Sequence, residues 1–262
     1  MSQRQPRSDK PATAETAPSH ARDRTGYAWL STRPLHILLF LLPLIVVYEI
    51  GSVLFLTNAQ TGAMETIRAE RLLRDFFESV GVAGLHLPAL AIVAVLLSWQ
   101  IISRDRWRVS FSTLVLMGFE SLAWTLPILV LNNVVGGSLL GGGAHAAASV
   151  GGGFEAMSFP QRFSVAIGAG LYEELLFRMV LIALAHLIAH DLLRIRDYPA
   201  RVIAVVVSAA AFALYHDAAT TDAALFAFYF AAGCLFGSVY LWRGFGIVVG
   251  AHAAYDLVAL LL

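Results

Sequence analysis

Long apolar runs constrain this chain more than any other feature of its sequence. Hydrophobic residues make up 58% of its 262 residues, charged residues make up 14%, and the mean hydropathy is +0.70. An ordinary globular domain has about 25% charged and about 45–50% apolar residues. A helix needs about 20 mostly apolar residues to cross a bilayer, and such runs recur along the chain. The sequence therefore predicts an all-α, polytopic transmembrane helix bundle of about seven spans. The predicted spans are Leu35–Leu56, Leu85–Ile102, Phe111–Leu131, Phe163–Ile188, Val202–Thr220, Ala223–Trp242 and Phe245–Leu262.

The N-terminal segment has a different composition. Residues 1–32 are polar and rich in Arg, Ser, Thr and Pro, with few large apolar side chains before Tyr27. Such a segment cannot bury enough surface to offset its ordering entropy. We therefore expect residues 1–32 to form a disordered cytoplasmic tail and residues 35–262 to form one transmembrane domain. The only cysteine, Cys234, lies in an apolar run, which excludes an internal disulfide framework.

Arginines gather in alternate connections between the predicted spans. With seven spans, the tail, residues 104–108, residues 194–201 and Arg243 all fall on one side of the membrane. By the positive-inside rule this predicts a cytoplasmic N-terminus and an exterior C-terminus. We expect the chain to lie in the plasma (inner) membrane. Residues 57–84 also carry arginines, but their apolar side chains recur at helical spacing, which indicates an amphipathic surface helix. The net charge of zero gives no sign of a nucleic-acid partner.

The predicted fourth span carries an unusual cluster of charged residues. Ionisable side chains inside a bilayer are costly, so Glu173, Glu174 and Arg178 need a reason to be there. At about 100° per residue, Arg178 stands roughly 40° from Glu174 and roughly 140° from Glu173. This geometry predicts that Arg178 pairs with Glu174 and leaves Glu173 as a carboxylate with spare basicity. A buried ion-pair cluster that only holds helices together is the alternative.

Two further spans carry imidazole and acidic groups. Phe212 and His216 are one turn apart, so the aromatic ring can shield the imidazole from lipid. His252 and Asp256 share a helix face, where either can orient the other. The alternatives are a packing histidine and an internal hydrogen bond. At about 1.5 Å per residue from the basic loops, Glu173 and these groups lie roughly 14–30 Å into the membrane, so they can meet in its outer half.

The three clusters together are similar to a known family. The pattern E-E-x-x-x-R, then F-x-x-x-H, then H-x-x-x-[ND] resembles the CAAX protease and bacteriocin-processing family, also called the Abi family. Its members are intramembrane glutamic endopeptidases, and they include the Ras-converting CAAX prenyl protease. The resemblance covers residues 160–262 and implies a membrane-anchored protein or peptide as the substrate.

The resemblance also implies roles for individual residues. It implies that Glu173 and His216 activate water and that His252 and Asp256 act at the oxyanion. The family prototype has Asn where this chain has Asp256, and a carboxyl group donates a hydrogen bond only when it is protonated. Asp256 either donates in that form or orients His252. The resemblance assigns structural or supporting roles to Glu174, Arg178 and Phe212.

Other chemistries lack their motifs. The chain has no H-E-x-x-H zinc motif, no serine in a G-x-S-G setting and no G-x-G-D motif, and we expect no cofactor. A divalent metal such as zinc on Glu173, His216 and His252 is the alternative. A non-enzymatic transporter or proton-coupled carrier is the rival function, but carriers often contain a repeated half and this sequence shows no repeat. The stretch Gly136–Gly153 is expected to be a linker or a gate over a cavity that opens to the exterior.

Overall fold

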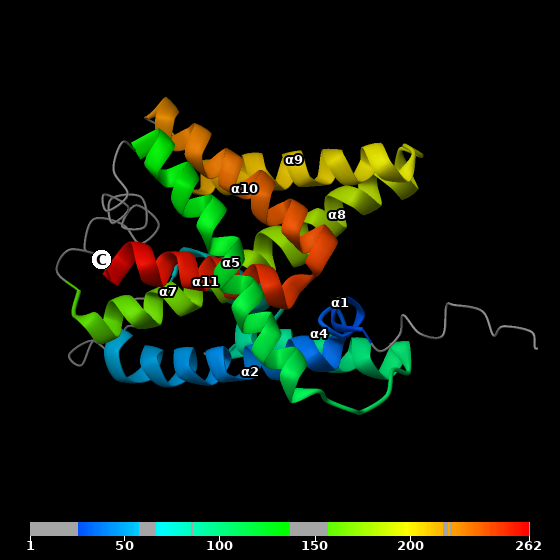
Figure 1. Cartoon of the computed structure of the whole chain (residues 1–262), viewed down its shortest axis with the longest axis horizontal. Coiled ribbons are helices and arrows are strands. Elements are labelled where there is room, and N and C mark those ends of the chain that lie inside the picture. Colours follow the sequence, from blue (N-terminus) through cyan, green and yellow to red (C-terminus); the bar gives the residue numbers. More distant parts are fainter. Residues whose placement is uncertain are drawn as a thin grey trace, which may run out of the picture.

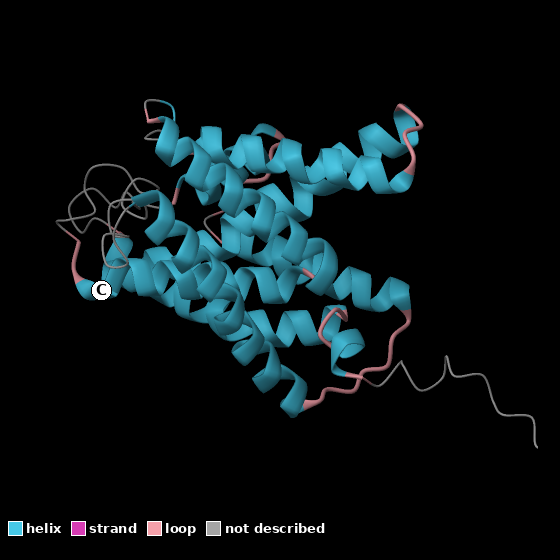
Figure 2. Ribbon diagram, turned by 45° about the horizontal axis from the view of Figure 1, so that its top comes forward, coloured by secondary structure: helices cyan, strands magenta, loops and turns pink. Residues whose placement is uncertain are grey.

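Every regular element in the described part of the chain is a helix (Figures 1 and 2). The computed structural model describes residues 26–57, 67–84, 86–136, 157–216, 220 and 222–261. It confirms the prediction of an all-α polytopic bundle. Most of the predicted tail, most of the glycine-rich stretch, and Leu85, Asp217 and Leu262 lie outside the described residues.

In the described part of the chain, five helical rods are long and apolar enough to cross a membrane, and two of the predicted spans are shorter apolar helices. The long rods are α2 with the π-helical η3 (Pro34–Gly51 and Ser52–Leu56), α5 (Phe111–Gly136), the rod from α7 to η6, α9 (Asp197–Tyr215) and α10 (Ala223–Arg243). The rod from α7 to η6 consists of α7 (Phe159–Glu174), the π-helical η5 (Leu175–Ile182), α8 (Ala183–His186) and the π-helical η6 (Leu187–Leu192). The shorter apolar helices are α4 (Leu87–Ser103) and α11 (Phe245–Leu261), and the remaining helices are α1 (Tyr27–Leu30) and α3 (Arg68–Ser79).

The observed helix ends differ from the predicted ones by four or more residues in three spans. The third ends at Gly136 rather than Leu131. The fourth covers Phe159–Leu192, and it starts earlier than predicted because Ser158 and Gln161 form a capping box before its apolar part begins. The fifth starts earlier and ends at Tyr215 rather than Thr220. Hydropathy marks the apolar part of a helix, whereas caps and polar first turns decide where the helix starts.

Helices α7 and α11 form the centre of the bundle. Helix α11 packs mainly against α7 and α5, α10 packs against α9, and α2 packs against α4 and α7. In Figure 1, α2 and α4 lie on one side of the α7–α11 pair, α9 and α10 lie on the other, and α5 crosses diagonally.

Small residues set the closest approaches between helices. A Cβ atom added to Gly170 of α7 would lie 2.8 Å from the Cβ atom of Ala253 in α11. One added to Gly233 of α10 would lie 2.8 Å from the Cα atom of Ala209 in α9. Gly233 and Gly237 form a G-x-x-x-G motif, which is typical of close helix packing, and Gly233 lies at such a contact. Gly170 brings the backbone that carries the paired glutamates against the backbone that carries His252.

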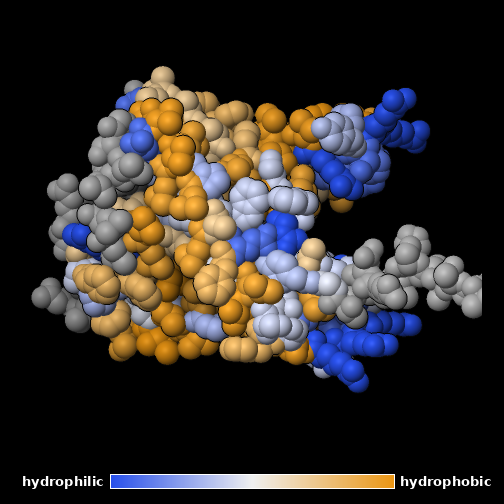
Figure 3. All heavy atoms as spheres, viewed as in Figure 1, coloured by the Kyte–Doolittle hydropathy of each residue, from blue (hydrophilic) through white to orange (hydrophobic). Residues whose placement is uncertain are grey.

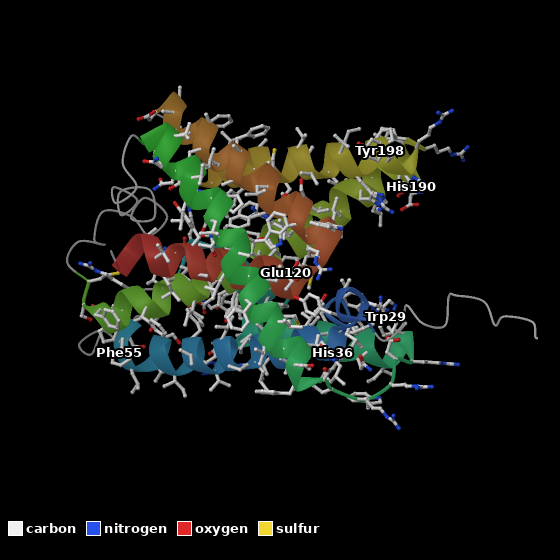
Figure 4. The ribbon with its side chains drawn as sticks, in the orientation of Figure 1. Trp29, His36, Phe55, Glu120, His190 and Tyr198 are labelled. Carbon is white, nitrogen blue, oxygen red and sulfur yellow. The ribbon has the colours of Figure 1, made fainter. Side chains whose placement is uncertain are left out.

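The two ends of the bundle differ in polarity. Hydrophilic residues gather at the end where the α4–α5 and η6–α9 connections lie, while hydrophobic residues cover much of the visible sides (Figure 3). Figure 4 places Trp29, His190 and Tyr198 at that end and Phe55 at the opposite one. The N-terminal helix and the arginine-rich connections thus share one end, as the loop charges predict.

Helix α3 is the amphipathic helix expected within residues 57–84. Its Ala69, Glu70 and Leu73 are buried, whereas Leu72 and Phe76 are exposed. The hydroxyl of Tyr48 in α2 donates a hydrogen bond to the carboxylate of Glu70. These contacts attach α3 to the bundle beside α7.

Candidate active site

The three predicted motifs converge on one buried cluster. Glu173 lies at the end of α7, His216 directly follows α9, and His252 belongs to α11. An oxygen of the Glu173 carboxylate, Oε2, lies 3.9 Å from Nε2 of His216 and 3.8 Å from Nε2 of His252. All three side chains are buried, so the groups face one another away from lipid and bulk solvent.

The end of α9 fixes the orientation of His216. Its backbone leaves the helix at this residue, which would leave the carbonyl oxygen of Phe212 without its usual i+4 amide donor. The Nδ1–H of His216 donates to that oxygen over 2.8 Å. A carbonyl oxygen only accepts, so the neutral imidazole presents the lone pair of Nε2 to Glu173. The F-x-x-x-H spacing therefore sets the tautomer of the histidine as well as its position.

Aromatic rings enclose the imidazole of His216. The ring of Phe212 packs edge-on against it at 4.7 Å, and the ring of Tyr229 stacks on it at 3.8 Å with planes 14° apart. The shielding role predicted for Phe212 agrees with this geometry. Tyr229 comes from α10, a helix in which the sequence showed no functional motif.

The carboxylate of Glu174 contacts two partners, Arg178 and His252. Its Oε2 lies 3.1 Å from Nε of Arg178, as the helix geometry predicts, although the helix widens to a π-helix just after Glu174. Its Oε1 lies 2.7 Å from Nδ1 of His252. A carboxylate accepts on both oxygens, so Glu174 neutralises Arg178 and also accepts a hydrogen bond from His252.

Arg178 is fully buried among aromatic rings. Its guanidinium carbon lies 4.3 Å from the ring centre of Phe212 and 5.4 Å from that of Phe236. Glu174 is the carboxylate that pairs with it among the described residues. The carbonyl oxygen of Phe177 in η5 accepts a hydrogen bond from the Ser208 hydroxyl over 2.7 Å, which ties η5 to α9.

Asp256 contacts His252 less closely than Glu174 does. Its Oδ2 lies 3.5 Å from Nε2 of His252, on the ring edge opposite the Glu174 contact. The local i, i+4 contact expected from the sequence therefore exists. The shorter hydrogen bond to His252, however, comes from another helix.

A small cavity lies beside these groups. Its polar lining consists of Glu173, His216, His252, Asp256, Tyr229 and Tyr255, and its apolar lining consists of Ile128, Phe212, Phe228, Ala232 and Phe236. The volume open to the centre of a water molecule is about 20 Å³. A cavity needs about 10–15 Å³ by this measure to hold one water. The second oxygen of Glu173, Oε1, is buried and has no hydrogen-bond partner among the described residues.

Several contacts near the site had no clear signal in the sequence. Arg68 of α3 donates to the backbone oxygen of Tyr215 over 2.7 Å, directly before His216. This contact holds the end of α9 from a helix that precedes it by over 140 residues. Nothing in the local sequence around Arg68 distinguishes it from the other arginines of α3.

Two partly buried acids, Glu49 and Glu120, pair with neighbouring helices. Glu49 accepts from the hydroxyl of Tyr172 and contacts His86. Glu120 pairs with Arg243 and accepts from the hydroxyl of Tyr27. Tyr27 lies in the segment assigned to the tail, whose last residues therefore fold against the bundle as α1.

Metal-ligand geometry is not found among the described residues. No group of three or more His, Cys, Asp or Glu side chains there has the arrangement needed to hold a metal ion. The two distances that join Glu173 to His216 and His252 are longer than direct hydrogen bonds.

Comparisons with known proteins agree with the motif pattern. Residues 155–258 match the model of a family described as type II CAAX prenyl endopeptidase Rce1-like. The matched segment contains all three motifs. No curated protein and no solved structure matches the chain.

Proposed function

Because residues 155–258 match the model of the Rce1-like type II CAAX prenyl endopeptidase family, we propose that the chain is an intramembrane glutamic endopeptidase. It hydrolyses a peptide bond of a membrane-anchored protein or peptide with water as the nucleophile. One observation carries the proposal. A carboxylate oxygen of Glu173 faces Nε2 of His216 and Nε2 of His252 beside a cavity with room for about one water molecule.

Glu173 and His216 activate the water. One water molecule can donate one hydrogen bond to the Glu173 carboxylate and the other to the lone pair on Nε2 of His216. The water oxygen attacks the carbonyl carbon of the scissile bond, and the proton that it loses passes to Glu173. A carboxylate that is poorly hydrated in a buried site is a stronger base than one in water.

His252 acts on the negative charge that develops on the carbonyl oxygen. Glu174 accepts a hydrogen bond from Nδ1–H of His252, so His252 donates from Nε2 only as the protonated imidazolium, whose Nε2–H points toward the cavity. A fixed donor at such an oxyanion typically contributes about 3–4 kcal/mol to the barrier reduction. When the tetrahedral intermediate collapses, the C–N bond breaks and Glu173 returns its proton to the leaving nitrogen. Asp256, 3.5 Å from Nε2, stabilises the positive charge on His252.

The proposed mechanism needs no metal or other cofactor, since Glu173 supplies the base and the imidazoles supply the remaining polar contacts. The proposed substrate is a membrane-anchored chain with a C-terminal CAAX-type motif, which the family description supports. The hydrophilic end in Figure 3, where the arginine-containing α4–α5 and η6–α9 connections lie, supports a cytoplasmic N-terminus. The proposed location is the plasma (inner) membrane.

Proteomics of membrane-protein termini tests the function. Cells that express the wild type and cells that express Glu173→Gln are compared at equal protein levels. We expect new termini that form only with the wild type, and these define the cleavage sites. Identical termini in both cells would contradict the proposal.

A further inference from the structure

The cavity beside Glu173 is rich in acceptors and poor in donors. The Nε2 atom of His216 is an acceptor, because its Nδ1 donates to Phe212. Ionised Glu173 and Asp256 also accept only. An oxyanion, by contrast, is stabilised by donors that are fixed before the reaction. His252 can supply one donor, and a second must come from another group in the lining.

Tyr255 has a hydroxyl suited to this role. The side chain lies on α11 between His252 and Asp256, is only 5% exposed and lines the cavity. Its hydroxyl is buried and has no hydrogen-bond partner among the described residues. Buried hydroxyls are rarely unpaired, since an unpaired one costs about 1–3 kcal/mol. A donor left unpaired at the cavity wall is available to whatever occupies the cavity.

Tyr215 carries the other buried tyrosine hydroxyl that makes no close hydrogen bond in the described part of the chain, and its polar neighbours are the Glu173 carboxylate and the backbone of Ala69. Its side chain is not part of the cavity lining, and its ring packs on Phe177 at 5.2 Å. Tyr229 lines the cavity and stacks on His216, but its hydroxyl is not one of the buried hydroxyls that lack a hydrogen-bond partner. Within the described residues, Tyr255 is therefore the tyrosine that combines a place in the cavity lining with an unpaired buried hydroxyl.

We propose that the Tyr255 hydroxyl is a catalytic hydrogen-bond donor to the oxyanion, alongside His252. This inference rests on the proposed endopeptidase function. The hydroxyl keeps its proton throughout, so the step adds one hydrogen bond and no bond is made or broken at Tyr255. Because the neighbouring Asp256 carboxylate cannot donate, the phenol supplies what an amide at position 256 would otherwise supply.

The experiment compares variants in proteoliposomes on an internally quenched peptide that spans a Glu173-dependent cleavage site. Tyr255→Phe removes only the hydroxyl, and rates are expressed per folded molecule. We expect kcat to fall about 100-fold, with KM within about threefold of the wild type, as for the loss of one oxyanion donor. Tyr240→Phe removes a tyrosine hydroxyl from α10 outside the cavity lining, and its kcat should stay within about threefold of the wild type.

A double variant tests the donor role itself. Asp256→Asn places an amide donor beside position 255, so Tyr255→Phe with Asp256→Asn should regain at least about tenfold in kcat over Tyr255→Phe alone. A Tyr255→Phe kcat within about threefold of the wild type overturns the inference and leaves the endopeptidase function standing. A loss that appears in KM and is not rescued also overturns it, because the residue would then position substrate. If no Glu173-dependent cleavage site exists, the proposed function fails and this inference fails with it.

Discussion

Replacing Glu174 by glutamine separates the roles of the paired glutamates. The Glu174 carboxylate lies 3.1 Å from Nε of Arg178 and 2.7 Å from Nδ1 of His252, and both Glu174 and Arg178 are fully buried. A glutamine offers one acceptor oxygen in place of two, so it cannot serve both partners. Removing one member of a buried ion pair costs about 3–5 kcal/mol. We expect the free energy of unfolding of Glu174→Gln to fall by about that amount and its cleavage rate to fall as well.

The assay is denaturant unfolding in detergent micelles, with cleavage measured on the same preparations. Glu173→Gln is the matched control. Its Oε1 has no hydrogen-bond partner among the described residues, and its nearest basic nitrogens lie 3.8–3.9 Å away, so the amide loses no close hydrogen bond. Stability should therefore fall by less than about 1 kcal/mol while cleavage is abolished. Glu174→Gln combined with Arg178→Met removes both charges and should recover much of the lost stability. Wild-type stability in Glu174→Gln would refute the ion-pair argument.

Three further predictions follow from the packing, the proposed chemistry and α3. Gly170→Val should lower the free energy of unfolding by about 1–3 kcal/mol, because its Cβ atom would lie 2.8 Å from the Cβ atom of Ala253. An unchanged free energy of unfolding in the same assay would contradict the close packing of α7 and α11. A chelator such as EDTA should leave the cleavage rate within about twofold of the untreated rate, and a loss restored by zinc would favour the metal alternative. Burial raises the pKa of the Glu70 carboxyl above 4.5, so the folded state binds this proton more tightly than the unfolded state. The Glu70 contribution to stability should therefore be largest below about pH 4.5 and be lost as the pH rises through the raised pKa, whereas Glu70→Gln should lack this pH dependence. Denaturant unfolding of both proteins between pH 4 and 7 measures the difference. A Glu70-dependent rise in stability with pH would contradict this prediction.

The sequence predicts the parts of the fold that depend on composition and local spacing. Apolar runs identify the helices, and the i, i+4 spacing identifies the pairing of Glu174 with Arg178. The helix ends are less predictable, because Ser158 and its capping box lie outside the apolar run that hydropathy detects. The conversion to a π-helix after Glu174 also has no local signal, and the Ser208 hydroxyl that donates a hydrogen bond to it belongs to another helix.

The positions of several site residues cannot be read from the sequence, because they depend on contacts between segments that are distant in the chain. The spacing on α11 points to Asp256 as the partner that orients His252, yet the shorter hydrogen bond comes from Glu174 of α7. Neither Arg68 nor Tyr255 has a periodic pattern that indicates its position. Each becomes meaningful only when helix packing places it beside a group far away in sequence, at the end of α9 or at the cavity.

The most direct test of the account is cleavage by the purified protein with and without the Glu173 carboxylate. Wild type and Glu173→Gln are reconstituted in proteoliposomes and given an internally quenched, S-farnesylated peptide with a C-terminal CAAX motif and the same peptide without the lipid. The account predicts that the wild type cleaves at least one of them and that Glu173→Gln is slower by about 10³-fold or more, with unchanged folding. Cleavage by Glu173→Gln at more than about a tenth of the wild-type rate would contradict the assignment of Glu173 as the base.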